Sequence, residues 1–262
     1  MNIGFIGLGN MAGAMIGGLR QNKTKDEILG FDLNVKLKES RKKEFGITVC
    51  ADNRELAQKA DYIVLAVKPQ FLTPVLEEID PVLDKKKVII SIVAGKSLGF
   101  LSERITNTQK IVRCMPNTAA LVGAAITAVT PSEKVSENEL KKAVSIIESF
   151  GKASVVPERL MDAVTGVSGS SPAYVFMFIE AMADAAVLEG MPRAQAYEFA
   201  ANAVYGSAKL MIETGKHPGE LKDMVTSPAG TTIEGVKALE DGAFRATVME
   251  AVIAAAERSK EL

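Results

Sequence analysis

A glycine-rich turn near the amino terminus is the first feature of the sequence that could do chemistry. Gly7, Gly9 and Ala12 form a GxGxxA pattern, directly after the apolar run of residues 2–6 and before a helix-like stretch. The first glycine of such a pattern permits a tight bend, and the second lets the backbone approach a pyrophosphate. The free amides at the start of the following helix then face the anion. The pattern favours a dinucleotide site over a purely structural turn.

Polar residues also follow two later apolar runs. Asp32 ends the second run, where an acid usually hydrogen-bonds the adenosine ribose of NAD and disfavours the 2′-phosphate of NADP. The nearby Asn34 and Lys36 could instead meet that phosphate, and Asp32 could simply cap the next helix. Lys68, after the fourth run, could face a cofactor or the solvent. The local chemistry leans toward NAD without deciding between the two cofactors.

The segment TSPAGTTIE, residues 226–234, is a second candidate site. Ser227 followed by Pro228 fits a helix N-cap and first helical position. Thr231 with Glu234 fits a capping box. In either case the amides and hydroxyls at a helix start suit a carboxylate. From these residues alone, a well-capped structural helix explains the segment equally well.

Two kinds of element must position these residues. Up to about residue 156, short β-branched runs alternate with amphipathic stretches, the pattern of a doubly wound parallel sheet. Beyond that point long Ala- and Met-rich stretches read as helices. We predict an α/β fold, with residues 1–156 as a Rossmann-like dinucleotide-binding domain and residues 157–262 as an all-helical domain. The expected strands lie within residues 2–6, 27–32, 46–50, 61–67, 87–93, 110–115, 125–129 and 153–156.

The expected helices include one that is apolar nearly all round and is therefore predicted to be buried on most sides. So much apolar helical surface suggests that a second copy of the chain covers part of it. Glu180 and Asp184 interrupt the longest apolar run, so we expect no membrane span. The apolar helix is expected at residues 173–190. The other expected helices are residues 71–79, 192–214, 233–240 and 243–260.

The composition narrows the function classes. The 31 Lys and Arg against 32 Asp and Glu argue against nucleic-acid binding, and the Lys-rich residues 36–44 read as a solvated face. Cys50 and Cys114 lack metal-ligand spacing, and His217, the one histidine, is expected in a turn before a helix. His-based hydrolysis and metal sites are therefore disfavoured, and no metal is expected. The amino terminus lacks the basic region of a signal peptide, so we predict a cytoplasmic protein.

Five segments, in order along the whole chain, closely resemble the pyrroline-5-carboxylate reductase family: GFIGLGNMAGAM, AVKPQ, MPNTAALVG, TGVSGSSPAYVF and HPGELKDMVTSPAGTTIEGVKALE. The resemblance implies an oxidoreductase that reduces the ring imine of 1-pyrroline-5-carboxylate to L-proline by hydride transfer from NAD(P)H, the last step of proline biosynthesis. It also implies that the helical domain serves dimerisation and substrate binding. The homodimer would interlock these domains, the substrate loop of one subunit would meet the cofactor of the other, and some members form decamers.

The resemblance also implies residue roles. Thr232 would hydrogen-bond the ring nitrogen and be the catalytic residue, while Ser227 and the amides of Gly230 and Thr231 would hold the substrate carboxylate. The protonated imine is already electrophilic, so catalysis would consist mostly of placement. The glycine turn and the strand-end loops would bind the cofactor, together with the polar residues after the second run. These are Ile6, Gly7, Leu8, Gly9, Asn10, Met11, Asp32, Asn34, Asn53, Ala66, Val67, Lys68, Pro69, Ile92, Val93, Ala94 and Asn117.

The chain departs from the family pattern at a few positions. It has Ala229 and Ser171 where the family usually has Gly, and Ala119 where Pro is usual. None of these changes removes a hydrogen-bonding group. Most members prefer NADPH, often with Ser or Arg near the end of the second strand. We therefore expect NADPH as cofactor, while Asp32 keeps NADH open.

Two other functions compete with this interpretation. A β-hydroxyacid dehydrogenase would carry a catalytic lysine soon after a Gly-rich stretch at the domain junction, but residues 166–178 contain no lysine. A non-catalytic nicotinamide sensor would share the fold, but residues 227–232 keep the groups expected to hold a substrate. Hydride transfer by the purified protein distinguishes these functions.

Overall fold

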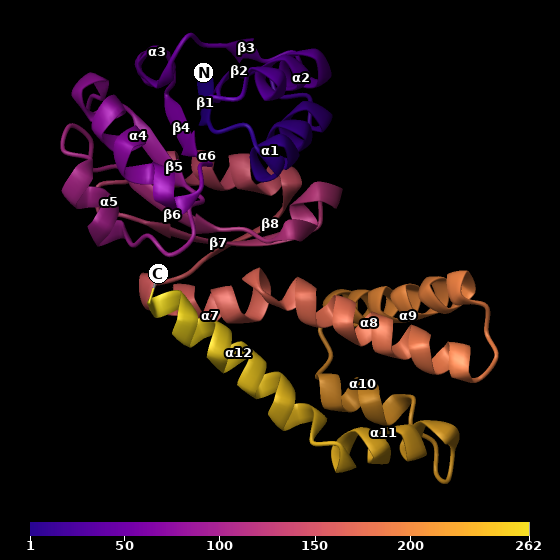
Figure 1. The fold of residues 1–262 in the computed structure, drawn as a ribbon. Helices are drawn as coiled ribbons and strands as arrows, with labels where there is room; N and C mark the ends of the chain where they lie inside the picture. The colour runs from indigo at the N-terminus through magenta and orange to yellow at the C-terminus, as the bar shows by residue number, and fades with distance from the viewer. Residues whose placement is uncertain (262) are drawn as a thin grey trace. The chain divides into compact units, whose positions relative to one another are not determined.

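The computed structural model describes residues 1–261 (Figure 1). By its internal contacts the chain divides into two units, Met1–Ser170 with the residues from Ala254 onward, and Ser171–Ile253. The predicted domain boundary between residues 156 and 157 stays a prediction.

The first unit is built on an eight-stranded sheet of order β3-β2-β1-β4-β5-β6-β7-β8, as the described residues show. Each predicted apolar run overlaps one of these strands, so the predicted strands are confirmed, although β7 ends two residues later and β8 begins two residues earlier than predicted. The order places β1 inside the sheet next to β4, and the strand order changes direction between these two strands. The strands are β1 Asn2–Ile6, β2 Glu27–Phe31, β3 Thr48–Val49, β4 Tyr62–Leu65, β5 Val88–Ser91, β6 Ile111–Met115, β7 Ala125–Pro131 and β8 Gly151–Val155.

The prediction of a doubly wound parallel sheet is wrong at one pair of strands. β7 runs antiparallel to β6, with Cys114 opposite Val129, whereas β8 returns parallel to β7. Only residues 116–124 join β6 to β7, and they include the short 3₁₀ helix η3, Thr118–Val122. A parallel connection needs a dozen or more residues. The short connection therefore forces the antiparallel pairing.

Helices cover both faces of this sheet. Consecutive strand residues point to opposite faces, so Val64 belongs to the buried cluster under α1 and α6, whereas Ile63 belongs to the cluster under α3, α4 and α5. Each face therefore has a core of its own. The two cores hold the strands in place, and with them the loops at the strand ends. The helices are α1 Asn10–Gln21, α2 Val35–Phe45 and α6 Glu137–Ile147 on one face, and α3 Asn53–Lys59, α4 Leu72–Ile79 and α5 Leu98–Arg104 on the other.

Short helical turns complete the first unit. The predicted helix at residues 71–79 begins as a 3₁₀ turn at Pro69 before α4. After β8, a 3₁₀ turn leads into α7 and then a π-helical turn, and the Ser259 hydroxyl donates to Asp162 Oδ1 at 2.7 Å. These elements are η1 Pro69–Phe71, η2 Asp80–Val82, η4 Glu148–Phe150, η5 Glu158–Leu160, α7 Met161–Val164 and η6 Thr165–Gly169.

The second unit is helical. α8 and α9 pack against each other through the small buried residues Ala183, Ala196 and Ala200. Each predicted helix of this part of the chain is present, with its ends shifted by at most two residues. The elements are α8 Ser171–Leu188, α9 Arg193–Thr214, α10 Pro218–Met224, α11 Thr231–Asp241 and α12 Phe244–Lys260, the last of which runs on into the first unit.

The prediction that the apolar helix is buried on most sides is wrong within one chain. Ala183 is the one residue of α8 classed as buried, whereas Phe176 and Met177 are 66% and 69% exposed. α8 packs mainly on α9, and toward α12 the Tyr174 hydroxyl donates to the Ala251 carbonyl at 3.2 Å. Among the described residues, large side chains such as Phe176 and Met177 therefore remain exposed. The helical run Glu158–Leu188 is also long and apolar enough to cross a membrane, by length and composition alone. This finding departs from the expectation of no such span.

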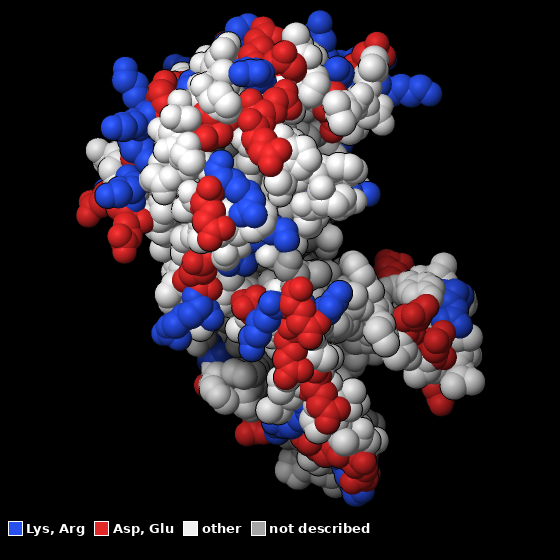
Figure 2. Space-filling view, turned by 60° about the vertical axis from the view of Figure 1, so that its left-hand side comes forward, with Lys and Arg blue, Asp and Glu red and all other residues white. Residues whose placement is uncertain are grey.

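Charged side chains are mixed in sign on the face that Figure 2 shows, where Lys and Arg alternate with Asp and Glu. This mixture agrees with the formal net charge of −1. A field of one sign, as a phosphate backbone would require, is not seen on that face.

Candidate cofactor and substrate sites

The glycine turn has the geometry that a pyrophosphate needs. Gly7 has φ +91°, and a Cβ built on it would lie 2.6 Å from the Ala66 carbonyl oxygen, so only glycine fits there. Gly9 faces open space, because a Cβ added to it would meet nothing within 4 Å. Gly9 is also the N-cap of α1 and offers no side-chain cap, and the first turn holds no acidic residue. The first amides of α1 are therefore available to an anion.

Asp32 and Arg41 hold the peptide groups on both sides of Leu8 in this turn. The Leu8 amide donates to Asp32 Oδ2 at 2.8 Å, and Asp32 Oδ1 accepts from the Asn34 amide at 2.8 Å. On the other side, Arg41 Nε donates to the Leu8 carbonyl at 3.3 Å. The turn is therefore fixed by side chains from the end of β2 and from α2.

The alternative that Asp32 caps the following helix is wrong. Asn34 is the N-cap of α2, and its side chain accepts from the Leu37 amide at 3.3 Å. Arg41 is absent from the predicted site residues, because it lies in the Lys-rich stretch that reads as a solvated face. The contact of Arg41 with the Leu8 carbonyl depends on α2 packing beside α1, which no local sequence pattern predicts.

The predicted strand-end loops meet at one edge of the sheet. The Ala66 amide donates to the Ile6 carbonyl at 2.9 Å, and the Ile92 amide donates to the Leu65 carbonyl at 3.2 Å. β5 and β6 are also parallel, so Asn117 follows β6 at the same edge. The structure thus brings together the turn after β1 and the loops 66–69 and 92–94.

The predicted cofactor residues differ in what they can present. Ile6, Leu8 and Val93 are buried in the core, so they can offer only backbone groups to a ligand. Lys68 and Asn10 are at least partly exposed. Asn53, 6% exposed, begins α3, and its Nδ2 donates to Glu78 Oε2 at 2.7 Å.

Two buried amide oxygens lack a hydrogen-bond partner within the described residues, Asn53 Oδ1 and Asn117 Oδ1. An unpaired buried acceptor costs about 1–3 kcal/mol. Both residues follow strands of the sheet, and Asn117 shares an edge with the glycine turn. The open glycine turn, the free helix amides and these acceptors fit a bound dinucleotide, which carries hydroxyl and amide donors.

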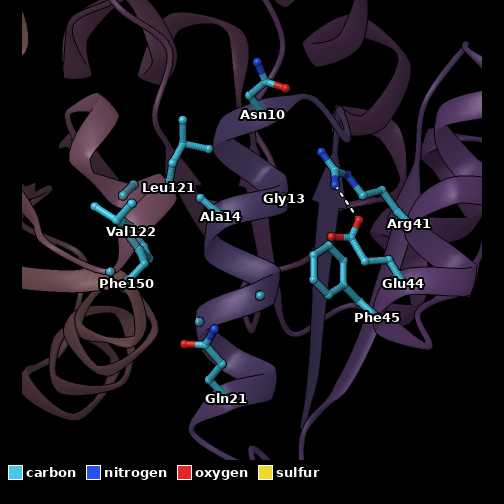
Figure 3. Close-up of a pocket in the computed structure, with 14 residues that line it drawn as sticks. Asn10, Gly13, Ala14, Gln21, Arg41, Glu44, Phe45, Leu121, Val122 and Phe150 are labelled. Carbon is cyan, nitrogen blue, oxygen red and sulfur yellow. Dashed lines mark hydrogen bonds and ion pairs between the residues drawn. The ribbon is translucent and has the colours of Figure 1, made fainter. Parts of the chain in front are cut away.

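A cavity of about 360 Å³ runs along α1 (Figure 3). Arg41, Glu44 and Phe45 line one side of it, and Leu121 and Val122 line the other. Of the predicted cofactor residues, this cavity contains Asn10 alone. The cavity therefore does not coincide with the strand-end edge.

The predicted substrate loop is a tight turn that leads into α11. The Gly230 amide donates to the Ser227 carbonyl at 3.1 Å, and Ala229 between them has φ +56°. A Cβ on Gly230 would lie 2.3 Å from Ser227 Oγ, so glycine lets that hydroxyl lie over the turn. Thr231 and Thr232 then begin α11.

Both predicted caps for this helix are wrong. Gly230 is the N-cap of α11 and makes no side-chain cap bond, so neither Ser227 nor Thr231 caps it. The turn closed by Gly230 places the helix start three residues later than the Ser-Pro pair suggests. As a result the first amides of α11 remain open to a ligand. The predicted turn before a helix at His217 is confirmed, because its Nδ1 accepts from the Gly219 amide at 3.1 Å.

The two cysteines are buried thiols without a disulfide bond. Burial raises the pKa of the Cys114 thiol far above its usual range, and burial also raises the pKa of Cys50. Neither side chain therefore offers a reactive thiolate near neutral pH.

Comparisons with known proteins match both the sheet unit and the helical unit of this chain. A family model described as pyrroline-5-carboxylate reductase dimerisation matches residues 158–262, and one described as NADP oxidoreductase, coenzyme F420-dependent, matches residues 2–95. The pyrroline-5-carboxylate reductase of Escherichia coli K12 is 50% identical over 265 residues, which cover 99% of this chain and 97% of the relative. The chain belongs to the pyrroline-5-carboxylate reductase family. The pyrroline-5-carboxylate reductase of Methanosarcina acetivorans is 47% identical over 262 residues, covering 99% and 97%.

Solved structures of pyrroline-5-carboxylate reductases share the fold over the whole chain. The Coxiella burnetii protein has a TM-score of 0.94 at 34% identity, covering 99% of this chain and 97% of that one. The Plasmodium falciparum pyrroline carboxylate reductase with NADP bound has a TM-score of 0.88 at 34% identity, covering 100% and 97%. A prephenate dehydrogenase at 16% identity and a TM-score of 0.57 shows the fold alone.

Membership of the pyrroline-5-carboxylate reductase family confirms several expectations. The fold class is an α/β nucleotide-binding domain followed by a helical dimerisation domain. The protein is an enzyme of proline biosynthesis with an NADP-binding type of domain. The dehydrogenase and sensor alternatives are thereby set aside. The roles of individual residues stay predictions.

Proposed function

We propose that the chain reduces the ring imine of 1-pyrroline-5-carboxylate to L-proline with NAD(P)H, as the last step of proline biosynthesis. The match to pyrroline-5-carboxylate reductases over 99% of the chain carries this proposal. The open glycine turn and the uncapped start of α11 support it, because each offers amides to an anionic group.

The cofactor site comprises the turn after β1 and the three strand-end loops at the same edge. The turn of residues 6–11 holds the pyrophosphate through its free amides at the start of α1, and loop 66–69 lines the cofactor beyond it. Loop 92–94 and Asn117 lie at the nicotinamide end. The cofactor supplies a hydride when bound. The chain's contribution is to fix the orientation of the nicotinamide and to exclude water.

The substrate site is the turn before α11. The Ser227 hydroxyl and the amides of Gly230 and Thr231 bind the carboxylate at the positive end of the helix. The Thr232 hydroxyl orients the ring nitrogen and can pass a proton to it. No nucleophile is needed, because the protonated imine accepts hydride directly.

The working enzyme is a homodimer, in some assemblies a decamer, whose helical units cover each other. The exposed apolar side chains of α8, α9 and α12 support this proposal, as does the match of residues 158–262 to a dimerisation family. The substrate loop of one copy then completes the cofactor site of the other. Burial of the run Glu158–Leu188 in such a dimer would account for its hydropathy without a membrane.

We also propose a cytoplasmic location, with a small-molecule substrate and no nucleic-acid partner. Fractionation of expressing cells tests the location. The protein is expected in the soluble fraction, and recovery in the membrane fraction contradicts it.

The reaction is tested by the loss of nicotinamide absorbance with pyrroline-5-carboxylate, and by detection of proline. For Thr232→Ala we expect a turnover lower by about a hundredfold or more, with unchanged cofactor affinity. Thr232→Ser keeps the hydroxyl and should retain most activity. Thr214→Ala, at the exposed end of α9, is the matched control.

Two outcomes contradict different parts of the proposal. Equal turnover of Thr232→Ala and the unmodified protein removes Thr232 from the site while leaving the reaction in place. Failure to oxidise either NADPH or NADH with this substrate, in a protein that still binds them, contradicts the assigned reaction itself.

A further inference from the structure

The carboxylate of Asp32 is held at the carboxyl end of β2 in one fixed orientation. Each of its oxygens accepts a hydrogen bond from a backbone amide with an N···O distance of 2.8 Å, one from Leu8 in the glycine turn and one from Asn34 before α2. Asp32 is only partly exposed, and it directly follows Phe31, the last residue of β2. A negative charge is thus fixed beside the turn that binds the pyrophosphate.

This carboxylate retains acceptor capacity. An ionised carboxylate has about four lone-pair sites, and the two amides use one site on each oxygen. The remaining sites suit two adjacent hydroxyls, such as those of a ribose. At the end of the second strand of a Rossmann-like sheet, an acid meets the adenosine ribose.

The basic side chains of α2 offer little to offset this charge. Lys38 Nζ lies 4.8 Å from the centre of the Phe31 ring. The Arg41 guanidinium already has two partners, because Nη1 pairs with Glu44 Oε2 at 2.7 Å and Nε donates to the Leu8 carbonyl at 3.3 Å. Lys36 is exposed at the second position of α2, and a flexible exposed lysine binds an anion weakly.

We propose that Asp32 makes this reductase prefer NADH to NADPH, by accepting hydrogen bonds from the adenosine ribose and repelling a 2′-phosphate. The phosphate carries a charge of about −1.5 to −2 at neutral pH, so it meets a fixed like charge. Such a repulsive element is an effective way to separate two otherwise similar ligands. The inference rests on the proposed function and specifies which nicotinamide cofactor serves it.

The test is the ratio of kcat/KM for NADH to that for NADPH, measured with saturating pyrroline-5-carboxylate. The ratio is expected above one for the unmodified protein. Asp32→Asn removes the charge and should lower the ratio by about tenfold or more. If this variant also loses the hydrogen bonds from the Leu8 and Asn34 amides, the binding of both cofactors weakens together, so the ratio isolates the effect of charge.

Two further variants sharpen the test. Asp26→Asn is the matched control, since Asp26 precedes the opposite end of β2 and pairs with Lys142 at 2.9 Å. It should leave the ratio unchanged. Lys36→Gln should raise the ratio, but by a smaller factor than Asp32→Asn lowers it.

A preference for NADPH in the unmodified protein overturns the inference, and so does a ratio that Asp32→Asn leaves unchanged. The dissociation constants of NADH and NADPH, measured by fluorescence without substrate, give the same ratio independently of turnover. If both cofactors bind and neither is oxidised, the proposed reaction fails, while the ratio of dissociation constants still supports or overturns the role of Asp32.

Discussion

The two units of this chain bury their apolar residues to very different extents. The sheet unit has two buried clusters, one under each layer of helices. The helical unit has one small cluster, built on three alanines, and leaves large apolar side chains exposed. The sheet unit can therefore fix its site within a single chain. In the proposed dimer, a second copy supplies the rest of the core of the helical unit.

The difference also appears in how each candidate site is held. The glycine turn after β1 is fixed from two sides by Asp32 and Arg41. The turn before α11 is closed by one hydrogen bond between neighbours, from Gly230 to Ser227, and it contains a strained alanine. We expect substitutions in the first unit to act through local geometry, and those in the second to act also through assembly.

The largest effect is expected from a charge on the exposed face of α8. Phe176→Glu places a carboxylate on a face that the proposed dimer buries, where an unpaired charge costs several kcal/mol. We expect dissociation at micromolar concentration and loss of most activity. Sedimentation velocity with activity assays measures both.

Lys209→Glu, which changes the charge of an already exposed and charged position on α9, is the control for this variant. It should remain a dimer. A monomeric mass for the unmodified protein, or a fully active Phe176→Glu dimer, would remove the contrast between the two units.

The next effect separates the two glycines of the turn after β1. Gly7→Ala places a Cβ at a position with positive φ and 2.6 Å from the Ala66 carbonyl oxygen. It should therefore lower the free energy of unfolding by about 2–4 kcal/mol. Gly9→Ala has open space and an ordinary φ of −63°, so its stability should change little. Both variants should bind the cofactor less tightly, since both disturb the approach of the pyrophosphate.

Thermal unfolding combined with fluorescence titration of the cofactor tests this pair. Equal stability of the two variants would mean that the backbone at Gly7 adapts. Normal cofactor affinity in Gly9→Ala would place the pyrophosphate elsewhere.

The same contrast explains which features could be predicted from the sequence. The strands and the glycine turn depend on neighbouring residues, so local patterns are sufficient. The antiparallel β7 depends on the length of residues 116–124, and Arg41 depends on the packing of α2 beside α1. The start of α11 is mispredicted, because two capping patterns overlap there and the turn closed by Gly230 decides between them. The exposure of α8 is mispredicted because an apolar pattern predicts burial without showing whether the same chain supplies the packing partner.

The smallest effect concerns the strained residue of the substrate loop. Ala229 has φ +56°, a left-handed conformation that disfavours any side chain with a Cβ, and Ala243 before α12 has the same φ. In Ala229→Gly and Ala243→Gly, release of this strain is partly offset by the greater freedom of glycine in the unfolded chain. We expect each to gain about 0.5–1 kcal/mol in free energy of unfolding. Thermal or urea unfolding at matched protein concentration measures the gain.

The two variants should differ in activity, although they match in stability. Ala229 lies between Ser227 and Gly230, so a freer backbone there loosens the groups proposed to hold the substrate carboxylate. Ala229→Gly should therefore raise KM for pyrroline-5-carboxylate, whereas Ala243→Gly should leave KM unchanged. A KM shift in both variants would point to a general loosening of the helical unit. An unchanged KM in Ala229→Gly would instead mean that the turn keeps its geometry without the methyl group, so that the strain at Ala229 serves no purpose in substrate binding.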